Sequence, residues 1–225
     1  FIKNPESTID LPNGQNVHFY PTNKFRITID KENIIKNKVV NPKDYDSIVP
    51  YIDLDIKDRA LYKNRIMMLD VIANNNWKRP VYFTGGSFGD DDYLWMKDYL
   101  QLDGLVYKLV PVKTTIDREY SIEMGQIDTD KMYDLVSKWQ WGNGDKTTIY
   151  HDPETRKNSI SYRTNMSRLA NQLIKESKKE KAKIIIDQAL SKMPIDYYGY
   201  YTMVEPFAAA YYKVGDKTKA REVLE

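Results

Sequence analysis

The sequence contains no cysteine in 225 residues, so disulfides and thiolate metal sites are excluded and the cellular compartment stays open. It also lacks a long hydrophobic run: no apolar stretch comes near the roughly 18 to 20 residues that a transmembrane helix needs. An excess of charge of one sign is missing as well, because 34 lysines and arginines stand against 32 aspartates and glutamates. General nucleic-acid binding requires a clustered basic excess, so we do not expect nucleic acid as a partner.

Histidine is scarce, and only His18 and His151 occur. Zinc sites with histidine ligands generally need more such side chains. Asp152 follows His151 and could orient it as a base, but we interpret His151 as a solvated loop histidine. We predict no catalytic residue, no hydrolase triad and no cofactor in this chain.

Aromatic side chains are abundant, with 18 tyrosines and 4 tryptophans. Tyrosine packs its ring and still offers a hydroxyl, which suits half-wet faces and binding surfaces. Such groups bind peptides or stack on sugars. They also join one part of a fold to another, and here we favour a junction between an α/β half and a helical half. The candidate binding residues are Trp95, Trp139, Trp141, Tyr197, Tyr198, Tyr201 and Tyr211.

Strand-like alternation marks the first 55 residues. The segment 16–20 alternates weakly between apolar and polar residues, and the segment 24–29 alternates well. Pro21–Asn23 supplies a turn between them, so we expect these two segments to form a hairpin. The stretch 48–56 is also predicted to be extended, although Pro50 argues against a central strand position.

From residue 58 the apolar residues follow a helical period. Leu61, Ile66, Leu69 and Ile72 form one stripe, and Asp58 suits the N-cap of that helix. The helix is predicted to end within 74–76, followed by a strand over 81–84, a helix over 93–100, a strand over 105–112 and a helix over 128–139. This alternation of helices and strands predicts a small α/β unit with parallel pairing.

A glycine-rich run, Thr84–Gly89, leads into three consecutive acids, Asp90, Asp91 and Asp92. The glycines could cradle a phosphate, but they match neither the dinucleotide fingerprint nor the P-loop. The three aspartates are the metal candidates of this chain. Neighbouring residues on a helical turn face different directions, however, so we expect no metal site there. We interpret the whole run as a strand-to-helix turn.

The strongest break in the chain is Gly142–Asp145. After it, two helix pairs repeat, with Ala170, Ala182 and Ala220 where only a small side chain lets two helices approach closely. We predict an α+β or α/β N-terminal domain with a small mixed sheet, followed by an α-helical tetratricopeptide-like hairpin region. The predicted boundaries are 1–142 for the first domain, 143–162 for a linker and 163–225 for the repeats, with the second copy truncated.

Two longer stretches carry a family resemblance, NNWKRPVYF at 75–83 and DYLQLDGLVYKLVP at 98–111. WGN at 141–143 and DPETRKNS at 152–159 add to it. These stretches resemble a bacterial family of large multi-pass membrane proteins, formerly of unknown function. That family is similar to protein O-mannosyltransferases and is glycosyltransferase-C-like. The resemblance covers residues 56–225.

The resemblance implies that membrane helices and the glycosyl-transfer site lie upstream of this region. It also implies that this region is a periplasmic domain, and that the family's catalytic acids have no counterpart here. The N-terminal Phe1–Pro5 has no initiator methionine and no signal-peptide pattern, and we read it as a cut inside a longer protein. The implied partners are the membrane-embedded half of the same polypeptide and a protein or glycan acceptor.

Three functions are therefore weighed. The first is a non-catalytic extracytoplasmic domain that positions an acceptor or partner for a glycosyltransferase-like membrane protein. The second is a sugar-binding or metal-assisted enzymatic module with a site near Gly85–Trp95. The third is a peptide-binding tetratricopeptide adaptor, which predicts an open groove lined by Tyr197, Tyr201 and Tyr211.

Overall fold

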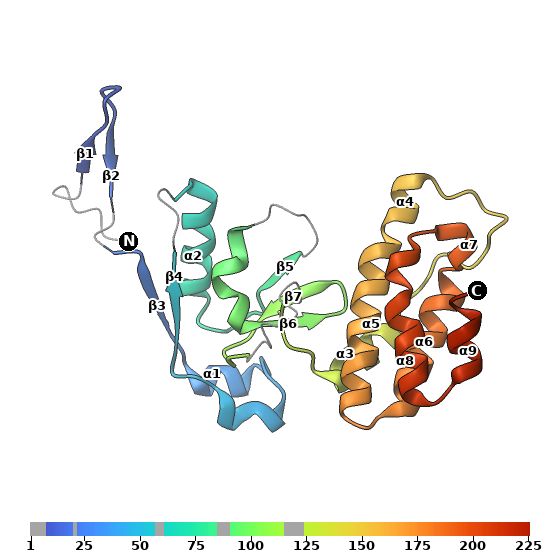
Figure 1. The fold of residues 1–225 in the computed structure, drawn as a ribbon. Coiled ribbons are helices and arrows are strands. Elements are labelled where there is room, and N and C mark those ends of the chain that lie inside the picture. Colours follow the sequence, from blue (N-terminus) through green and yellow to red (C-terminus); the bar gives the residue numbers. More distant parts are fainter. Residues whose placement is uncertain (1–7, 20–21, 57–60, 85–90, 115–123) are drawn as a thin grey trace. The chain divides into compact units, whose positions relative to one another are not determined.

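The computed structural model describes residues 8–19, 22–56, 61–84, 91–114 and 124–225. The chain folds as two compact units, whose elements Figure 1 labels. Unit 1 comprises Phe1–Val81, Asp91–Tyr99 and Val110–Lys113, and unit 2 comprises Tyr82–Asp90, Leu100–Leu109 and Thr114–Glu225. Unit 2 therefore runs through Gly142, near which the sequence predicts a domain boundary.

Unit 1 begins with a short hairpin of β1 (Thr8–Asp10) and β2 (Asn16–His18), which pair antiparallel. Its turn is closed by the backbone N–H of Leu11, which donates to the Gln15 carbonyl at 2.8 Å. Strand β2 thus takes its partner from the residues before it. The predicted hairpin between this strand and the one that follows is wrong.

The next strand, β3 (Lys24–Thr28), pairs antiparallel with β4 (Tyr51–Asp55). Strand β4 buries Ile52 and Leu54 and exposes the residues between them, so it offers the same alternation as β3. The two strands meet because matched alternation buries one apolar face, even though the partner lies far along the chain. The predicted extended stretch over 48–56 is confirmed, and Pro50 immediately precedes the strand.

Two short helices that the sequence analysis did not predict connect these strands. They are α1 (Lys31–Lys36) and the 3-10 helix η1 (Pro42–Ser47). The Asp30 carboxylate caps α1 by accepting from the Asn33 backbone N–H at 3.0 Å. Ile34, in the middle of α1, is fully buried.

Helix α2 (Lys63–Asn75) confirms the helix predicted after residue 58, with a later start. Leu69 and Ile72 of the predicted stripe are buried. The helix ends at Asn76, which adopts a left-handed conformation with φ of 46°, as asparagine tolerates. The predicted N-cap, Asp58, lies outside the described residues.

The helix predicted over 93–100 is the 3-10 helix η2 (Asp91–Tyr99), and a strand follows it directly. In unit 2, β5 (Tyr82–Thr84), β7 (Val106–Leu109) and β6 (Leu100–Asp103) form a sheet in the order β5-β7-β6. Both pairings are antiparallel, so the predicted parallel pairing is wrong. Strands β6 and β7 are joined by only two residues, Gly104 and Leu105, and so short a connection requires antiparallel strands.

From Thr129 on, the elements of unit 2 are helices, which confirms the predicted class of small sheets followed by a helical region. The helices are α3 (Thr129–Ser137), α4 (Pro153–Lys157), α5 (Ser159–Lys175), α6 (Lys179–Lys192), α7 (Ile195–Tyr198), η4 (Tyr201–Met203), α8 (Glu205–Val214) and α9 (Lys217–Glu222). The segment 143–162, predicted as a linker, contains α4 and the start of α5.

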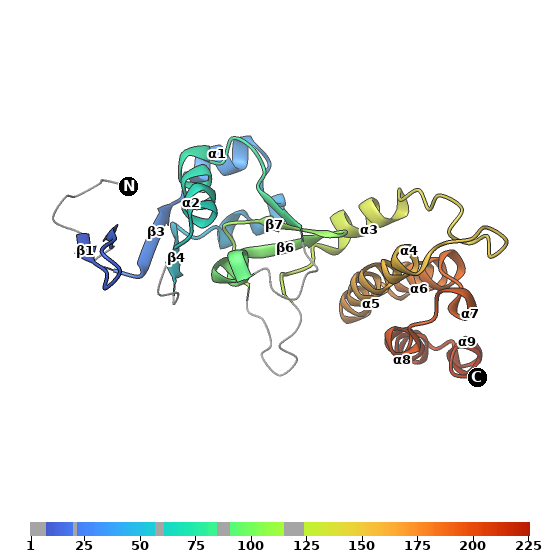
Figure 2. The same ribbon diagram turned by 90° about the horizontal axis from the view of Figure 1, so that it is seen from above.

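Helices α5 and α6 pack against each other across a three-residue connection, and α8 and α9 across a two-residue connection, so each pair runs antiparallel. Figure 2 shows α8 and α9 side by side. Ala170, Ala182 and Ala220 are fully buried in the common core of these helices. Small side chains let the helix backbones approach closely, which is the packing that the sequence predicts. The further identification of the pairs as tetratricopeptide-like repeats stays a prediction.

Among the described residues, no helix combines the length and apolarity that crossing a membrane would take.

Candidate binding cavity in unit 2

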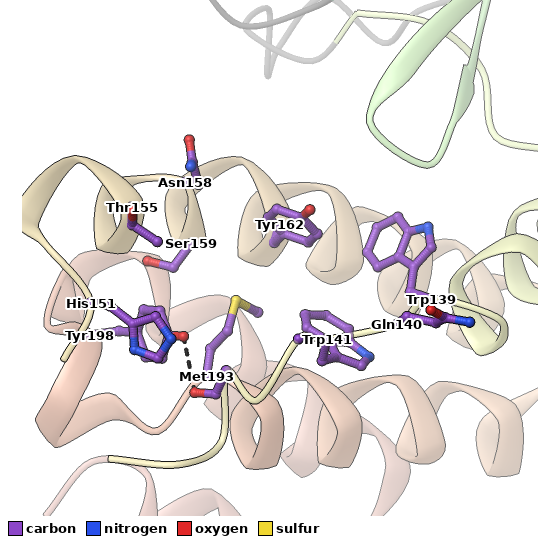
Figure 3. A pocket seen from close by; sticks show the side chains of 12 residues that line it. Trp139, Gln140, Trp141, His151, Thr155, Asn158, Ser159, Tyr162, Met193 and Tyr198 are labelled. Carbon is purple, nitrogen blue, oxygen red and sulfur yellow. Dashed lines mark hydrogen bonds between the residues drawn. The ribbon is translucent and has the colours of Figure 1, made fainter. Parts of the chain in front are cut away.

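A cavity of about 300 Å³ opens within unit 2, beside the first turns of helix α5. Its lining comes from the segment after α3, from α4 and α5, and from the end of α6 with α7 (Figure 3). The lining residues are Trp139, Gln140, Trp141, Gly142, Gly144, His151, Thr155, Asn158, Ser159, Tyr162, Met193 and Tyr198. The volume is at the lower end of the range of small-ligand pockets.

Three aromatic rings pack together at one end of the cavity (Figure 3). The ring centroids of Trp139 and Tyr162 are 5.2 Å apart, and those of Trp139 and Trp141 are 5.7 Å apart. Both pairs meet edge to face, with interplanar angles of 78° and 69°, which is a favoured geometry for aromatic rings. Trp141 and Tyr162 complete the triangle at 5.6 Å. We call these three rings the tryptophan cluster.

The β6–β7 turn holds the tryptophan cluster in place. Gly104 adopts a φ of +68°, and a Cβ there would lie 3.1 Å from Cζ2 of Trp139. The Gly104 carbonyl accepts a hydrogen bond from the Nδ2 amide of Asn165 at 2.9 Å. Asn165 stands three residues after Tyr162 on α5, so one face of that helix supports both the turn and the cluster.

A second aromatic group lies toward the other end of the cavity, where Figure 3 shows His151 beside Tyr198. The rings of His151 and Tyr197 are 5.6 Å apart, and those of Tyr197 and Tyr198 are 5.5 Å apart. Tyr197 itself does not line the cavity, but its ring packs against those of the lining residues His151 and Tyr198. We call these three residues the histidine cluster. His151 lies in the loop before α4, as the sequence predicts, and it is half-buried there.

Hydrogen bonds fix the proton position on His151. The Tyr197 hydroxyl lies 2.7 Å from the Ile149 carbonyl and uses its single proton there. It therefore accepts from the His151 backbone N–H at 2.7 Å and from the ring Nδ1 at 3.2 Å. Because Nδ1 must then carry hydrogen, a neutral His151 presents Nε2 as a hydrogen-bond acceptor. Within the described residues, Nε2 has no partner.

The segment 140–152, which contains Trp141 and His151, lines the cavity and is tied to α6 and α7; we call it the strap. The Tyr198 hydroxyl donates to the Gly144 carbonyl at 2.9 Å, the bond dashed in Figure 3. A Cβ on Gly144 would lie 3.1 Å from that same hydroxyl, so only glycine fits without displacement. Lys192 and Asp145 add an exposed ion pair at 3.0 Å, which contributes little by itself.

Two polar groups of the lining are buried without a hydrogen-bond partner in the part of the chain that the structure describes. They are the Oγ of Ser159 and the Nε1 of Trp141. Ser159 is only 2% exposed. A buried donor or acceptor that stays unpaired costs about 1 to 3 kcal/mol, so such groups call for an explanation. Both atoms belong to residues that line the cavity, but the atoms themselves have almost no accessible surface, so a bound molecule could pair with them only after neighbouring side chains shift.

The lining contains no acidic side chain, lysine or arginine among the described residues. Arg163, one turn beyond Ser159 on α5, is fully buried but does not line the cavity. It donates to the carbonyl of Gly199 at 2.5 Å and to that of Met193 at 2.9 Å, at the C-terminal ends of α7 and α6. Burial lowers the pKa of Arg163, and the two helix ends offset part of the cost of its charge. The described lining itself thus carries no charged side chain, and the Arg163 charge lies beyond it with backbone carbonyls as its partners.

The other predicted binding residues lie elsewhere. Trp95 belongs to unit 1, where the Arg65 guanidinium stands 5.4 Å from its ring. Tyr201 is 66% exposed, whereas Tyr211 is buried and donates to Asp187 at 2.5 Å. Tyr197, Tyr201 and Tyr211 therefore do not line one groove. The binding role of the seven aromatic residues stays a prediction, and three of them line the cavity.

Sequence reasoning did not select several lining residues, notably Ser159, Tyr162 and Met193. Ser159 and Tyr162 are three residues apart on α5, and only a helical-face count over 155–162 could have indicated them. Met193 caps α6 and carries no local signal.

The predicted glycine–acid run gives no site in the described residues. Gly85–Asp90 and the side chains of Asp91 and Asp92 lie outside them. Residues 85–89, GGSFG, do fit the Gly-x-Ser-x-Gly spacing of a hydrolase elbow, so the absence of a triad stays a prediction. An elbow of that kind joins a strand to a helix at the top of a parallel sheet, whereas β5 is the edge of an antiparallel one. No cluster of three potential metal ligands occurs in the described ranges.

A family model, TMEM260-associated domain 2, matches residues 2–131. The chain belongs to the TMEM260-associated domain 2 family. The match contains the stretches 75–83 and 98–111, which carry the family resemblance, and it ends inside α3. The cavity lining begins at Trp139 and lies beyond the part of this TMEM260-associated chain that the family model covers.

No curated protein matches the chain, and no solved structure matches it.

Proposed function

We propose that this chain is a non-catalytic, extracytoplasmic part of a membrane-embedded glycosyltransferase-like protein, and that it positions an acceptor or a partner. The family supports the first half of this proposal, because the matched residues 2–131 contain the stretches that resemble O-mannosyltransferase-like membrane proteins. The partners we propose are the membrane-embedded half of the same polypeptide and a protein or glycan acceptor. A periplasmic location belongs to the same proposal.

The cavity of unit 2 carries the second half of the proposal. It brings two aromatic clusters together with two buried polar groups, Ser159 Oγ and Trp141 Nε1, that have no hydrogen-bond partner among the described residues. Aromatic faces supply most of the contact area of a binding site, and a few placed polar groups set the orientation of the ligand. A cavity of this composition holds and orients a group.

The lining also favours binding over chemistry. Glycosidic chemistry commonly uses a pair of carboxylates, and the described lining contains none. His151 is the one titratable imidazole of the cavity, and its Nδ1 faces the Tyr197 phenol where a catalytic base would have an orienting carboxylate.

Transfer kinetics of the full-length protein test the proposal. Membrane vesicles that contain it would receive a labelled mannose donor and increasing amounts of an extracytoplasmic protein extract as acceptor. A positioning role predicts that Trp141→Ala raises the acceptor KM about tenfold or more and leaves kcat unchanged. Tyr201→Ala, at an exposed ring outside the cavity, is the matched control and should leave both constants unchanged.

Two results would contradict this function. One is a loss of kcat at saturating acceptor in Trp141→Ala, with the variant still folded by circular dichroism. The other is digestion of this region in intact cells only by a cytoplasmic protease, which would place it on the other side of the membrane.

A further inference from the structure

We propose that the cavity of unit 2 is a subsite for one uncharged sugar ring, a pyranose. This inference deepens the proposed function and depends on it for its biological meaning. It names the chemical class of the group that the domain holds. Three properties of the lining support it: its neutrality, its aromatic surface and the character of its unpaired polar groups.

Neutrality selects against charged ligands. The nearest cations are already engaged: the Arg163 guanidinium bonds two helix-end carbonyls, and Arg156 Nη1 donates to the Tyr197 carbonyl at 3.2 Å. Lys192 is paired with Asp145. A phosphate or carboxylate in the cavity would lose its hydration without gaining a direct ion pair from the described lining. Nucleotides, sugar phosphates and acidic sugars are therefore disfavoured.

The packing of the aromatic rings disfavours a cationic ligand and favours a ligand with an apolar face. A cation between aromatic rings needs an open space bounded by ring faces. In the tryptophan cluster the ring centroids are only 5.2 to 5.7 Å apart, so the rings fill that space themselves. What the cluster offers is a continuous outer surface. The C–H face of a pyranose packs on such a surface.

The polar groups match hydroxyl groups. Trp141 Nε1 can only donate, the Ser159 hydroxyl donates and accepts, and His151 Nε2 accepts. Neighbouring hydroxyls of a sugar donate and accept in the same way, so a ring bound at His151 Nε2 can also pair with Ser159 Oγ or Trp141 Nε1 once the side chains that cover them shift; within the described residues these two atoms have no partner. The cavity of about 300 Å³ suits a single ring.

Titration of the chain, monitored by nuclear magnetic resonance, tests this inference. The four tryptophans give four indole N–H signals, and single Trp→Phe variants assign them. The probes are the methyl glycosides of mannose, glucose, galactose and N-acetylglucosamine, at up to about 50 mM, which detects a Kd in the millimolar range. We expect at least one of them to shift the signals of Trp139 and Trp141 and to leave that of Trp95 unmoved.

Two variants measure the contacts. Ser159→Ala and Trp141→Phe each remove one polar partner and keep the packing, so each should weaken sugar binding about three- to tenfold. Trp95→Phe in unit 1 is the matched control and should bind as the unchanged chain does. Glucuronate and glucose 6-phosphate should bind more weakly than methyl glucoside because of their charge.

The inference is overturned if none of the four glycosides moves the Trp139 and Trp141 signals, or if glucuronate binds as well as methyl glucoside. It is also overturned if a neutral peptide, Gly-Ser-Thr-Gly, shifts these signals while the sugars do not. In that last case the proposed positioning function stands, because the acceptor KM of Trp141→Ala would still rise. Failure of the kinetic test with intact sugar binding would instead refute the proposed function alone.

Discussion

The Tyr197 hydroxyl holds His151 by two contacts, to the backbone nitrogen at 2.7 Å and to the ring Nδ1 at 3.2 Å. The same hydroxyl donates to the Ile149 carbonyl at 2.7 Å. One side chain of α7 therefore anchors the strap and selects the tautomer of the histidine in the cavity. The two effects can be separated by measurement.

Replacing Tyr197 by phenylalanine tests this anchor. The change keeps the ring and removes the hydroxyl, so the His151 N–H and the Ile149 carbonyl lose their partner. We expect unit 2 to lose about 1 to 2 kcal/mol of unfolding free energy in urea. We also expect the ¹⁵N spectrum of the His151 ring to change from the Nδ1–H tautomer to a mixture. Tyr201→Phe, at an exposed ring, should change neither. An unchanged Nδ1–H spectrum in Tyr197→Phe would show that another group sets the tautomer.

Gly104 supports the tryptophan cluster through its conformation and its lack of a side chain. Alanine at this position would have to adopt a φ of +68° with its Cβ 3.1 Å from the Trp139 ring. Gly104→Ala should therefore lower stability by about 2 to 3 kcal/mol, from backbone strain plus displacement of the indole. Gly142→Ala isolates the strain, because a φ of +54° applies there and nothing lies within 4 Å of its Cβ. The control should cost only about 1 kcal/mol, and equal losses in the two variants would argue against the contact with Trp139.

Arg163 joins α5 to the ends of α6 and α7 from a fully buried position. Arg163→Met removes the buried charge, but it leaves the carbonyls of Met193 and Gly199 without their donor. Hydrogen bonds from charged groups contribute about 1.5 to 3 kcal/mol each, and relief of the buried charge offsets part of that loss. We expect a net loss of about 2 kcal/mol in urea unfolding. Arg156→Met, in which only one such bond is lost, should cost less. A more stable Arg163→Met variant would mean that desolvation of the guanidinium outweighs its bonds.

The sequence predicted the longer helices of this fold and selected three of the twelve residues that line the cavity. Helical periodicity located α2, α3, α5 and α6, because each buries one stripe of apolar residues. Strand β6 was missed, since its four residues directly follow an aromatic stretch that reads as helix. The pairing of β3 with β4 was missed for a different reason: the partner is remote, and a turn signal lay nearer.

The aromatic residues show where composition stops being informative. Tyr197, Tyr198 and Tyr201 look equivalent in the sequence, yet one anchors the strap, one lines the cavity and one points to solvent. The difference arises from the short helix α7, which ends at Gly199 with a φ of +69° and redirects the chain. Ser159 and Met193 enter the cavity from separate helices. Only tertiary packing brings them together, so no local sequence pattern could have predicted the cavity.

The sheet of unit 2 makes a prediction about pH. Lys108 is 5% exposed on β7, opposite Gln101 of β6. Burial, with the nearby Lys131 charge, lowers the pKa of Lys108 from 10.5 to about 8, although Asp103 opposes this. The unfolded chain then binds more protons than the folded one between pH 8 and 10.5. The contribution of Lys108 to stability therefore rises with pH through this window, by about 3 kcal/mol in total.

Urea unfolding of unit 2 at pH 7.5 and 10 checks the sign, and a fall in this contribution would refute it. Because other groups titrate there too, the comparison is made against Lys108→Met, which should lack the rise.

Burial is the main cause of the lowered pKa of Lys108, and the charge of Lys131 lowers it further. The Lys131 ammonium group bonds the Asp103 carboxylate, which Gln101 Nε2 also contacts at 2.7 Å. Lys131→Met removes the like charge and leaves Asp103 to act on Lys108 alone. The pKa of Lys108 should then rise part of the way from about 8 towards 10.5, as a titration of ¹³Cε-labelled lysine would record. Lys138, at the exposed end of α3, pairs with Asp134. Lys138→Met therefore removes an equal charge farther along the helix and should leave the pKa of Lys108 unchanged. If the pKa of Lys108 stayed at its original value in both variants, burial alone would be what lowers it. The Asp103 carboxylate would then interact with Lys131 and have no effect on the pKa of Lys108.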